Sequence, residues 1–331
     1  VLYAKVAMEG LELANRLMNP AEREKLEQER RQEKEAAAGA AVRPGGGAAT
    51  AAPRASAVSR TVPVPVPRDL ERHVLRDYPI AHLLPYVNMQ MLLGHHLGLK
   101  GKVDRLLKER DAKALQVKAV VDGIYEDAIR NGTLRASGVY RFFPAQSDGD
   151  AVLVYDPADR RTVLQRFVFP RQPEAPHLCL ADYLRPVDSG EMDYVGFFVV
   201  TAGSGVRERA ERYKERGEFL LSHALQAVAL ETAEAFAERV HQIMRDVWGI
   251  PDPATLTMQD IFGAKYRGQR FSFGYPACPN LEDQAKLFAL LEPADIGVQL
   301  TEGFMMEPEA SVSAIVFSHP EARYFNAEKA E

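Results

Sequence analysis

A run rich in alanine, glycine and proline, from Ala36 to Arg60, most constrains how this chain folds. The run contains Gly45-Gly46-Gly47, and such a composition buries too little apolar surface to offset the conformational entropy that folding removes. We therefore expect a linker here that divides the chain. A flexible run of about 25 residues spans roughly 25–30 Å, which would let one domain change its docking face on another. An inert tether is the alternative, and the composition leaves both open.

The segments on the two sides of this run differ in kind. Residues 1–19 have the apolar spacing of an amphipathic helix, which must pack against something. Residues 21–35 are charged helix formers without an apolar stripe, so any helix there would be solvated. Alternating Val and Pro then favour an extended strap. We expect a helix at 1–19, a charged and then Gly/Ala/Pro-rich flexible linker at 20–60, and one large domain at 61–331.

Composition and charge argue against several classes of protein. The formal net charge of −5 gives no basic excess for binding nucleic acid. No window approaches eighteen uninterrupted apolar residues, so we expect no membrane association. Cys179 and Cys278 stand far apart, which disfavours a disulfide framework or a cysteine-rich zinc site and favours the cytoplasm. The chain begins Val1-Leu2-Tyr3 with no leader pattern, and we expect it to be a piece of a longer protein.

Strand patterns dominate the middle of the large domain. Ser147-Asp148-Gly149-Asp150 has the residues of a hairpin turn, so the strands beside it should pair in antiparallel fashion. Runs rich in Val, Phe, Tyr and Thr predict strands at Leu134 to Phe143, Ala151 to Tyr155, Thr162 to Phe169 and Tyr194 to Thr201. A last apolar run, near the C-terminus, predicts a strand at Val312 to Phe317.

Helical periodicity flanks these strands. It covers Leu115 to Ile129, ending at Asn131-Gly132, and about Phe219 to Trp248, ending at Gly249. A further helix should begin near Asn280 as its N-cap, with Asp283 at the capping-box position. Because helices and strands do not alternate strictly, we predict an α+β fold. Its central sheet would be mixed but largely antiparallel, with flanking helices, in a single large C-terminal domain.

Several common site motifs are missing. Gly203-Ser204-Gly205 lacks the third glycine of a dinucleotide-binding loop, and no P-loop lysine follows it. His95 and His96 are adjacent and should point to different sides of a helix or strand, so we interpret them as surface or capping residues. We assign no catalytic residue and no metal ligand to the chain.

Residues Tyr266 to Pro279 read Tyr-Arg-Gly-Gln-Arg-Phe-Ser-Phe-Gly-Tyr-Pro-Ala-Cys-Pro. Two prolines and an embedded glycine exclude a regular helix or a central strand, so we expect a rigid, irregular loop that exposes backbone groups. A ligand can satisfy such groups. On chemistry alone, a structural loop packed by its own aromatic side chains is the stronger interpretation.

The pattern R-x-x-x-G-Y-P-A-C-P, from Arg270 to Pro279, closely resembles the signature of the reactivation domain of cobalamin-dependent methionine synthase. Other segments resemble the same family in the same order, and the resemblance runs from about Thr61 to the C-terminus. They are Asp182-Tyr183, Asp193 to Gly196, Ala233 to Glu238, Trp248-Gly249, Leu300 to Glu302, Ala310 to Ser313 and Phe317 to Pro320. Residues 1–19 are similar to the final helix of the cobalamin-binding domain that precedes it in this family.

The resemblance implies a function in methionine biosynthesis. The domain would bind S-adenosylmethionine and present its methyl group for the reductive remethylation of inactive cob(II)alamin, while a flavodoxin-like or flavoprotein reductant supplies an electron. Cobalamin would be held by the neighbouring cobalamin-binding domain, because the cobalt-ligating Asp-x-His-x-x-Gly motif is absent from this chain. The homocysteine zinc and folate regions are absent as well. The fragment alone should therefore lack the complete methyltransferase activity.

The matching loop implies part of a binding site. A guanidinium holds a carboxylate well, and Arg270 is our choice for the ligand's carboxylate, with a surface salt bridge as the alternative. The loop around Ser272, Gly274 and Tyr275 would approach the adenine and ribose, with glycine needed because a side chain would block contact. Tyr275 could equally be a core aromatic.

The remaining candidates come from two other matching segments. Glu234 would face the sulfonium, although Glu231, Glu234 and Glu238 share one helix face and could form a merely solvated acidic surface. Tyr324 matches an aromatic of the family's ligand site, and Phe325 stands where a second Tyr can occur.

This sequence departs from the family at two further places. Forms of the family carry an Asp shortly before a Pro-aromatic pair, but His82-Leu83-Leu84-Pro85-Tyr86 lacks it, and Asp77 is the nearest upstream carboxylate. Asn280-Leu281 stand where some members have Glu-His, so no histidine can act from that position.

Two other functions compete with methyl-donor binding. One is a non-catalytic interaction module that docks a corrinoid domain or a reductase without binding a small molecule. The other is a cysteine enzyme that uses Cys278, but no His lies nearby in sequence to activate the thiol.

Overall fold

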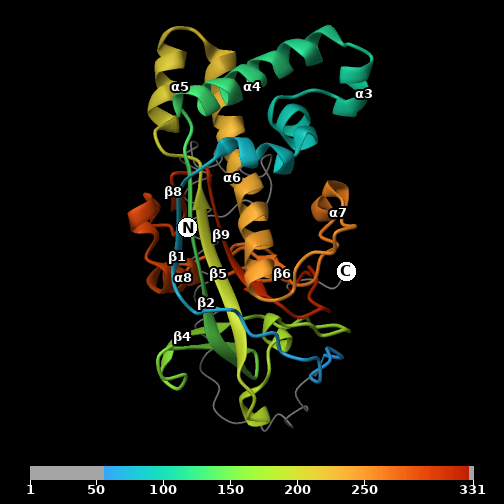
Figure 1. Cartoon of the computed structure of the whole chain (residues 1–331), viewed down its shortest axis with the longest axis vertical. Coiled ribbons are helices and arrows are strands. Elements are labelled where there is room, and N and C mark those ends of the chain that lie inside the picture. The colour runs from blue at the N-terminus through green and yellow to red at the C-terminus, as the bar shows by residue number, and fades with distance from the viewer. Residues whose placement is uncertain (1–55, 328–331) are drawn as a thin grey trace, which may run out of the picture. The chain divides into compact units, whose positions relative to one another are not determined.

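An antiparallel sheet lies at the centre of the protein in this computed structural model, which describes residues 56–327 (Figure 1). The predicted helix at residues 1–19, the charged spacer and most of the predicted linker fall outside the described residues. The strands are β1 (His73–Tyr78), β2 (Ala136–Asp148), β3 (Ala151–Tyr155), β4 (Val163–Val168), β5 (Asp193–Thr201), β6 (Gln269–Phe271), β7 (Gln299–Leu300), β8 (Met306–Glu307) and β9 (Ser311–Phe317).

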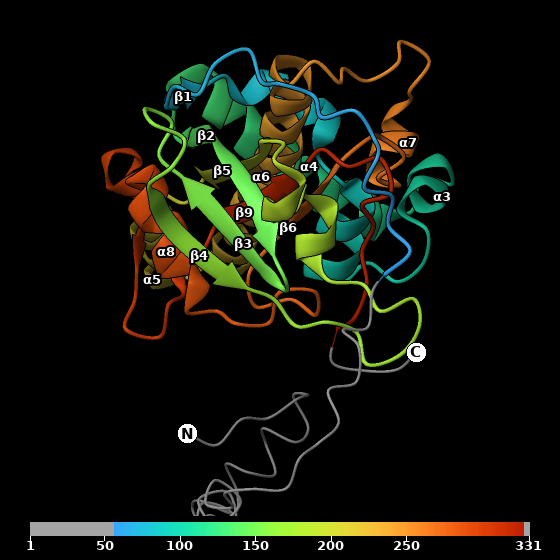
Figure 2. The same ribbon diagram turned by 90° about the horizontal axis from the view of Figure 1, so that it is seen from below.

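The helices lie on both faces and at one end of this sheet (Figures 1 and 2). The α-helices are α3 (Val103–Lys108), α4 (Ala112–Asn131), α5 (Val206–Glu215), α6 (Phe219–Val247), α7 (Met258–Phe262) and α8 (Asp283–Leu291). Short 3-10 turns are η1 (Ile80–His82), η2 (Leu84–Tyr86), η4 (Leu180–Tyr183), η5 (Val187–Ser189) and η6 (Pro293–Ile296), and η3 (Gln90–His96) is a π-helix.

Seven of the described strands join in one sheet, in the order β4-β3-β2-β5-β9-β6, with β1 paired to β2 as well. Each of these strand pairs is antiparallel. The predicted hairpin turn joins β2 to β3, with Asp148 opposite Ala151. These pairings confirm the predicted α+β fold class and its largely antiparallel central sheet with flanking helices.

The sheet is buried on both faces, which explains why its central strand β5 is mostly apolar. All nine residues of β5 are buried. Alternate residues belong to different cores because successive side chains of a strand point to opposite faces: Phe198 and Val200 pack on the side of α6, and Phe197 and Val199 on the side of α8. Figures 1 and 2 show α6 and α8 on opposite sides of the sheet.

Helix α6 is the long helix that the sequence predicts, and it crosses the sheet at close range. A methyl group added at Gly196 of β5 would lie 2.5 Å from Cε of Met244, and one added at Gly138 of β2 would lie 3.2 Å from the ring of Phe236. Small residues at the contact therefore let the helix approach the strands. This close contact fixes the position of the acidic side chains that α6 carries toward β6.

The start of α8 corrects one prediction. The helix begins at Asp283 with Glu282 as its N-cap, and not with Asn280. The side chain of Asn280 instead accepts a hydrogen bond from the backbone N–H of Glu282, two residues on, at 3.3 Å. Asn makes such local turns as readily as it caps helices, and sequence spacing alone does not separate the two.

Candidate functional site

Two adjoining cavities border α6 and the loop after β6. The first, which we call the aromatic chamber, has a volume of about 480 Å³ and is lined by Glu234, Arg270, Phe271, Ser272, Tyr275, Pro276, Ala277, Cys278, Val312, Tyr324, Phe325 and Asn326. The second, the histidine chamber, has a volume of about 470 Å³ and is lined by Tyr86, Asn88, Met91, His95, His96, Leu230, Glu231, Ala233, Glu234, Glu238, Phe262, Arg270, Tyr275, Ser311 and Val312. Because they share Glu234, Arg270, Tyr275 and Val312, we treat them as one groove.

Six of the seven site residues that we chose from the sequence line the aromatic chamber. They are Glu234, Arg270, Ser272, Tyr275, Tyr324 and Phe325. They come from three segments far apart in the chain, namely α6, the segment from β6 onward, and the C-terminal segment. The fold brings these segments together because β6 pairs with β9, with Arg270 opposite Val316.

Arg270 stands where the two chambers meet. Its Nη1 donates to Oε2 of Glu238 at 2.6 Å and to the hydroxyl of Tyr266 at 3.2 Å. Burial alone would lower the pKa of this guanidinium, but the carboxylate of Glu238 outweighs it and raises the pKa above its ordinary value. The side chain is therefore a permanent cation that Glu238 and Tyr266 hold on one side and that borders the groove on the other.

Two of the three carboxyl groups on the acidic face of α6 are buried, and Glu234 between them is exposed. Glu231 and Glu238 are only 5% and 7% exposed. Oε1 of Glu231 is hydrogen-bonded to Nε2 of His96 at 3.0 Å, and burial raises the pKa of Glu231 to about 7. Glu234 borders both chambers; desolvation raises its pKa, and the positive charge of Arg270 opposes that rise. The three carboxyl groups thus have three different environments.

The loop from Tyr266 to Pro279 is irregular as predicted, apart from the three residues of β6 at the edge of the sheet. Its turn is closed by hydrogen bonds from the N–H of Gly274 to the carbonyl of Cys278 (3.0 Å) and from the N–H of Cys278 to the carbonyl of Tyr275 (2.9 Å). The thiol of Cys278 donates to the carbonyl of Ser272, and burial raises the pKa of this thiol to about 12. A protonated, buried thiol stabilises the loop and is a poor nucleophile.

Gly274 is the one predicted site residue that does not line either chamber. It has φ of 87°, and an added methyl group would lie 3.1 Å from Cδ1 of Leu281. The left-handed backbone conformation is a local reason for glycine at this position, and the expected close approach of a ligand stays a prediction. Tyr275, which follows it, is 66% exposed at the edge of the groove and is not a core aromatic.

The C-terminal segment closes the other side of the aromatic chamber. The hydroxyl of Tyr324 donates to the backbone carbonyl of Arg270 at 2.7 Å, and its ring meets that of Phe271 edge-on at a centroid distance of 5.3 Å. Tyr324 nevertheless remains 60% exposed, so it forms an open wall of the chamber. Phe325 also lines the chamber but carries no hydroxyl.

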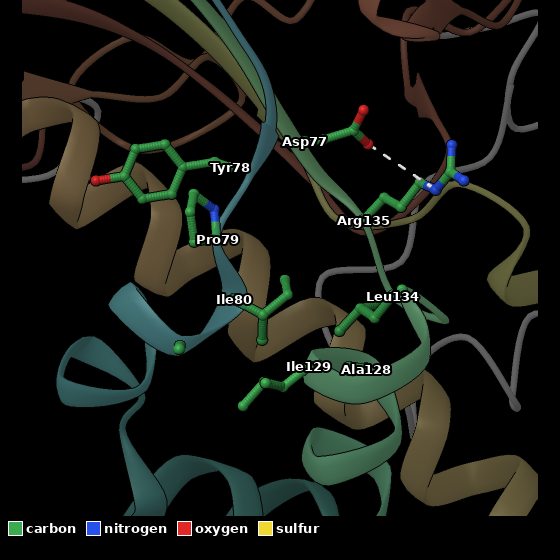
Figure 3. Close-up of a pocket in the computed structure, with 10 residues that line it drawn as sticks. Asp77, Tyr78, Pro79, Ile80, Ala128, Ile129, Leu134 and Arg135 are labelled. Atoms are coloured by element: carbon green, nitrogen blue, oxygen red, sulfur yellow. Dashed lines mark ion pairs between the residues drawn. The ribbon is translucent and has the colours of Figure 1, made fainter.

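Asp77 does not replace the acidic residue that this sequence lacks before Pro85. It lies at a separate cavity of about 350 Å³, where its carboxylate is 3.9 Å from Nε of Arg135. Figure 3 shows this cavity, with Ile80 and Leu134 in its apolar wall. The segment that follows Pro85 contributes Tyr86 and Asn88 to the histidine chamber.

Sequence reasoning missed His95 and His96. Both line the histidine chamber, with ring centroids 5.4 Å apart, so the expectation that they point to different sides was wrong. Neighbours on a helix are separated by only about 100°, and the wider π-helical turn of η3 lets both border one cavity. Within residues 56–327, no cluster of three or more His, Cys, Asp or Glu side chains could hold a metal ion.

Comparisons with known proteins match this geometry. The sequence model of the family described as "Vitamin B12 dependent methionine synthase, activation domain" matches residues 79–331, which is most of the chain. The chain belongs to this family. A crystal structure of the MetH reactivation domain bound to AdoHcy superposes with a TM-score of 0.77 at 30% sequence identity, covering 82% of this chain and 85% of that one. This match confirms the predicted activation-domain fold.

Two curated relatives extend the comparison. Methionine synthase of Mycobacterium tuberculosis is 31% identical and that of Mycobacterium leprae 29% identical, each over 98% of this chain. The activation-domain chain spans 30% of the length of either relative. In the part of this activation domain that the structure describes, no helix is both long enough and apolar enough to cross a membrane.

Proposed function

We propose that this activation domain binds S-adenosylmethionine in the groove between α6 and the loop after β6, and presents its methyl group to cobalamin held by a neighbouring domain. The observation that carries the proposal is Arg270, a half-buried cation at the junction of two chambers, with Glu234 beside it. A solved relative with 30% identity has AdoHcy bound, and AdoHcy is this donor after loss of its methyl group.

The charges of the ligand match those of the groove. Nη1 makes all the side-chain hydrogen bonds of Arg270 to the described residues, so Nε and Nη2 remain available for a ligand carboxylate. Carboxylates prefer such two-point contacts with a guanidinium. Glu234, whose raised pKa reflects the cost of burying its charge, would gain from a sulfonium or ammonium cation nearby.

The aromatic chamber suits the adenosine part of the ligand. Its walls combine the rings of Phe325 and Tyr324 with Ser272, Tyr275 and Pro276 of the loop after β6. Planar rings provide stacking area, and backbone groups provide hydrogen bonds to a heteroaromatic base. The chamber volume of about 480 Å³ is within the range of small-molecule sites.

The open form of the groove suits transfer to a bulky acceptor. Tyr275 and Tyr324 are both mostly exposed, so a ligand lying between them stays accessible from one side. Cobalamin would supply a cobalt centre that accepts the methyl group once an external reductant, of the flavodoxin or flavoprotein type, has delivered one electron. Residues 1–19 would belong to the cobalamin-binding domain, and residues 20–60 would link it to this one. The whole protein would then act in the cytoplasm as a methionine synthase.

Isothermal titration of this chain with S-adenosylmethionine tests the binding step. We expect saturable binding at one site, and no binding by adenosine triphosphate, whose phosphates would face the carboxylates of α6. Binding of neither compound would favour the interaction module without a small-molecule site.

Methyl transfer tests the second step. The rate of methyl transfer from S-adenosylmethionine to reduced free cobalamin should be low with this chain and higher when the cobalamin-binding domain is attached, because the linker raises the effective concentration of the acceptor. Equal rates would mean that the assembled interface does not contribute.

A further inference from the structure

A chain of buried charges runs from the end of α6 to the groove. Helix α6 ends with Trp248 as its C-cap, and Gly249 follows with φ of 76°. The N–H of Ile250 donates to the carbonyl of Arg245, and the N–H of Gly249 donates to that of Asp246, which is the Schellman arrangement. This reversal brings Asp252 back against the last turns of the helix.

Asp252 holds Arg245 by two hydrogen bonds. They run from Nε to Oδ1 at 2.7 Å and from Nη2 to Oδ2 at 2.6 Å, and the side chain of Arg245 is only 1% exposed. The guanidinium also lies over the ring of Tyr266, with Cζ 3.8 Å from the centroid. Asp252 is thus the acidic partner that fixes this buried cation.

Glu238 lies between two guanidinium groups. Its Oε2 is 2.6 Å from Nη1 of Arg270, whereas its Oε1 is 4.0 Å from Nη1 of Arg245, too far for a hydrogen bond. Both Oε1 of Glu238 and Nη1 of Arg245 are buried with no hydrogen-bond partner among the described residues. Glu238 could therefore form a further bond by turning toward Arg245. The bond from Arg270 holds Glu238 in place, and the two bonds from Arg245 to Asp252 keep Arg245 from competing for it.

We propose that Asp252 is a positioning residue of the methyl-donor site: by restraining Arg245, it leaves Glu238 to orient Arg270 toward the ligand carboxylate. The inference rests on the proposed function, because it requires a ligand whose carboxylate meets Arg270. Asp252 itself lines neither chamber, so any effect on the ligand passes through Arg245 and Glu238.

His241 is the last member of the cluster, and it adds no charge to it. Its Nδ1 lies 3.4 Å from Nη1 of Arg270, and the side chain is fully buried. Desolvation, together with the charges of Arg245 and Arg270, lowers its pKa well below the ordinary value, so it stays neutral. The charges of Arg245, Arg270, Glu238 and Asp252 then cancel. Neutralising Asp252 would leave one excess positive charge and free Arg245 to compete for Glu238.

The test compares two ligands that share the adenosine and the sulfur and differ in the amino-acid part, which carries the carboxylate and the ammonium. S-adenosylhomocysteine carries the amino-acid carboxylate, whereas 5′-methylthioadenosine keeps the adenosine and a neutral sulfur but has no carboxylate. The quantity measured is the ratio of their dissociation constants, obtained by titration of the wild-type chain and of Asp252→Asn. General damage to the fold would weaken the binding of both ligands. Loss of the orientation of Arg270 would weaken the binding of S-adenosylhomocysteine alone.

We expect Asp252→Asn to raise the dissociation constant of S-adenosylhomocysteine by roughly 5- to 50-fold. The dissociation constant of 5′-methylthioadenosine should change by no more than about 2-fold. In Asp252→Asn combined with Arg245→Met the competing cation is gone, so the wild-type ratio should return. Replacing a buried ion pair with apolar groups is commonly tolerated, so this double variant should fold even if the single one does not.

Asp295→Asn is the matched control. It removes another aspartate that holds an arginine at two points, with Arg72 Nη2 to Asp295 Oδ1 at 2.7 Å, outside both chambers. Its ligand ratio should equal that of the wild type. A wild-type ratio in Asp252→Asn, or a ratio that Arg245→Met fails to restore, would overturn the positioning role. Failure of the wild-type chain to bind either ligand would instead contradict the proposed function.

Discussion

At the scale of single residues, Arg270 bears most of the expected recognition of the ligand. A charge-assisted contact between a guanidinium and a carboxylate contributes about 1.5–3 kcal/mol, so Arg270→Ala should weaken S-adenosylmethionine by roughly 10- to 150-fold in an isothermal titration. Arg270→Lys should recover only part of this loss, because an ammonium cannot make the planar two-point contact.

Arg267→Ala provides a control from the same loop. Arg267 donates to the carbonyl of Ser318 at 3.0 Å and lines neither chamber, so its loss should leave the affinity unchanged. A folded Arg270→Ala protein with wild-type affinity would remove Arg270 from the site.

Glu231 should make the stability of the domain depend on pH. Burial raises its pKa from 4.5 to about 7, so the folded state holds a proton that the unfolded state releases between these values. The stabilisation is therefore complete below pH 4.5 and is lost as the pH rises to about 7. Relative to Glu231→Gln, the free energy of unfolding of the wild type should fall by up to about 3 kcal/mol over this interval.

Urea denaturation at a series of pH values measures this difference. Glu302→Gln, at an exposed position, should show the same pH dependence as the wild type. If the difference between the wild type and Glu231→Gln were flat from pH 4.5 to 7, Glu231 would have an ordinary carboxyl environment.

The candidate site could be predicted from the sequence only in part. Arg270, Ser272 and Tyr275 stand in one motif, so a resemblance over ten residues is enough to select them. Glu231 and His96 form their pair across 135 positions, and nothing in the local sequence of either indicates it. Asn88 and His95 likewise line the groove only because the folded chain brings η3 and the residues before it to α6. Contacts between distant segments are what the sequence alone did not show.

At the scale of elements, the contact of α6 with the sheet is the feature that positions the acidic side chains. Gly196→Ala should lower the free energy of unfolding by about 1–3 kcal/mol, because the added methyl group would lie 2.5 Å from Cε of Met244 and 3.2 Å from the ring of Phe142. Adding Met244→Leu, which removes Cε, should restore part of the loss. Thermal or urea unfolding measures both changes.

Gly123→Ala is the matched control for this prediction. Gly123 lies inside α4, and an added methyl group would meet nothing within 4 Å. Because alanine favours helices over glycine, this variant should be as stable as the wild type or more stable by about 0.5–1 kcal/mol. Equal stability of Gly196→Ala and the wild type would show that α6 is packed less closely than described.

The sequence predicted the strands and the two long helices well because each has a strong period of its own. Strand β3 agrees with the prediction at both ends, and α6 agrees to within one residue. Helix α5 was missed because charged residues dominate it and only Val206 and Ala210 are buried. Strand β6 was missed because three residues of an edge strand, ahead of a Gly-Pro turn, carry too little pattern to indicate a strand.

At the scale of the whole molecule, the predicted linker should be the most exposed segment to proteases. Its composition predicts that elastase, which cleaves after small residues, cuts first between Ala36 and Arg60. Within that range the cut should precede Val58 and Ser59, because Val58 packs against the core on the α8 side and the carbonyl of Ser59 accepts from His319 at 2.9 Å. Mass spectrometry of the first fragments locates the cut, and a first cut within residues 61–327 would contradict the predicted boundaries.

The central claim is that the groove holds the methyl donor, and a crystal structure of the chain with S-adenosylhomocysteine tests it most directly. We predict that electron density for the ligand fills the aromatic chamber, with its carboxylate within hydrogen-bonding distance of Arg270 and its sulfur beside Glu234. Ligand density in the separate cavity beside Asp77, or in the groove with the carboxylate away from Arg270, would contradict this account.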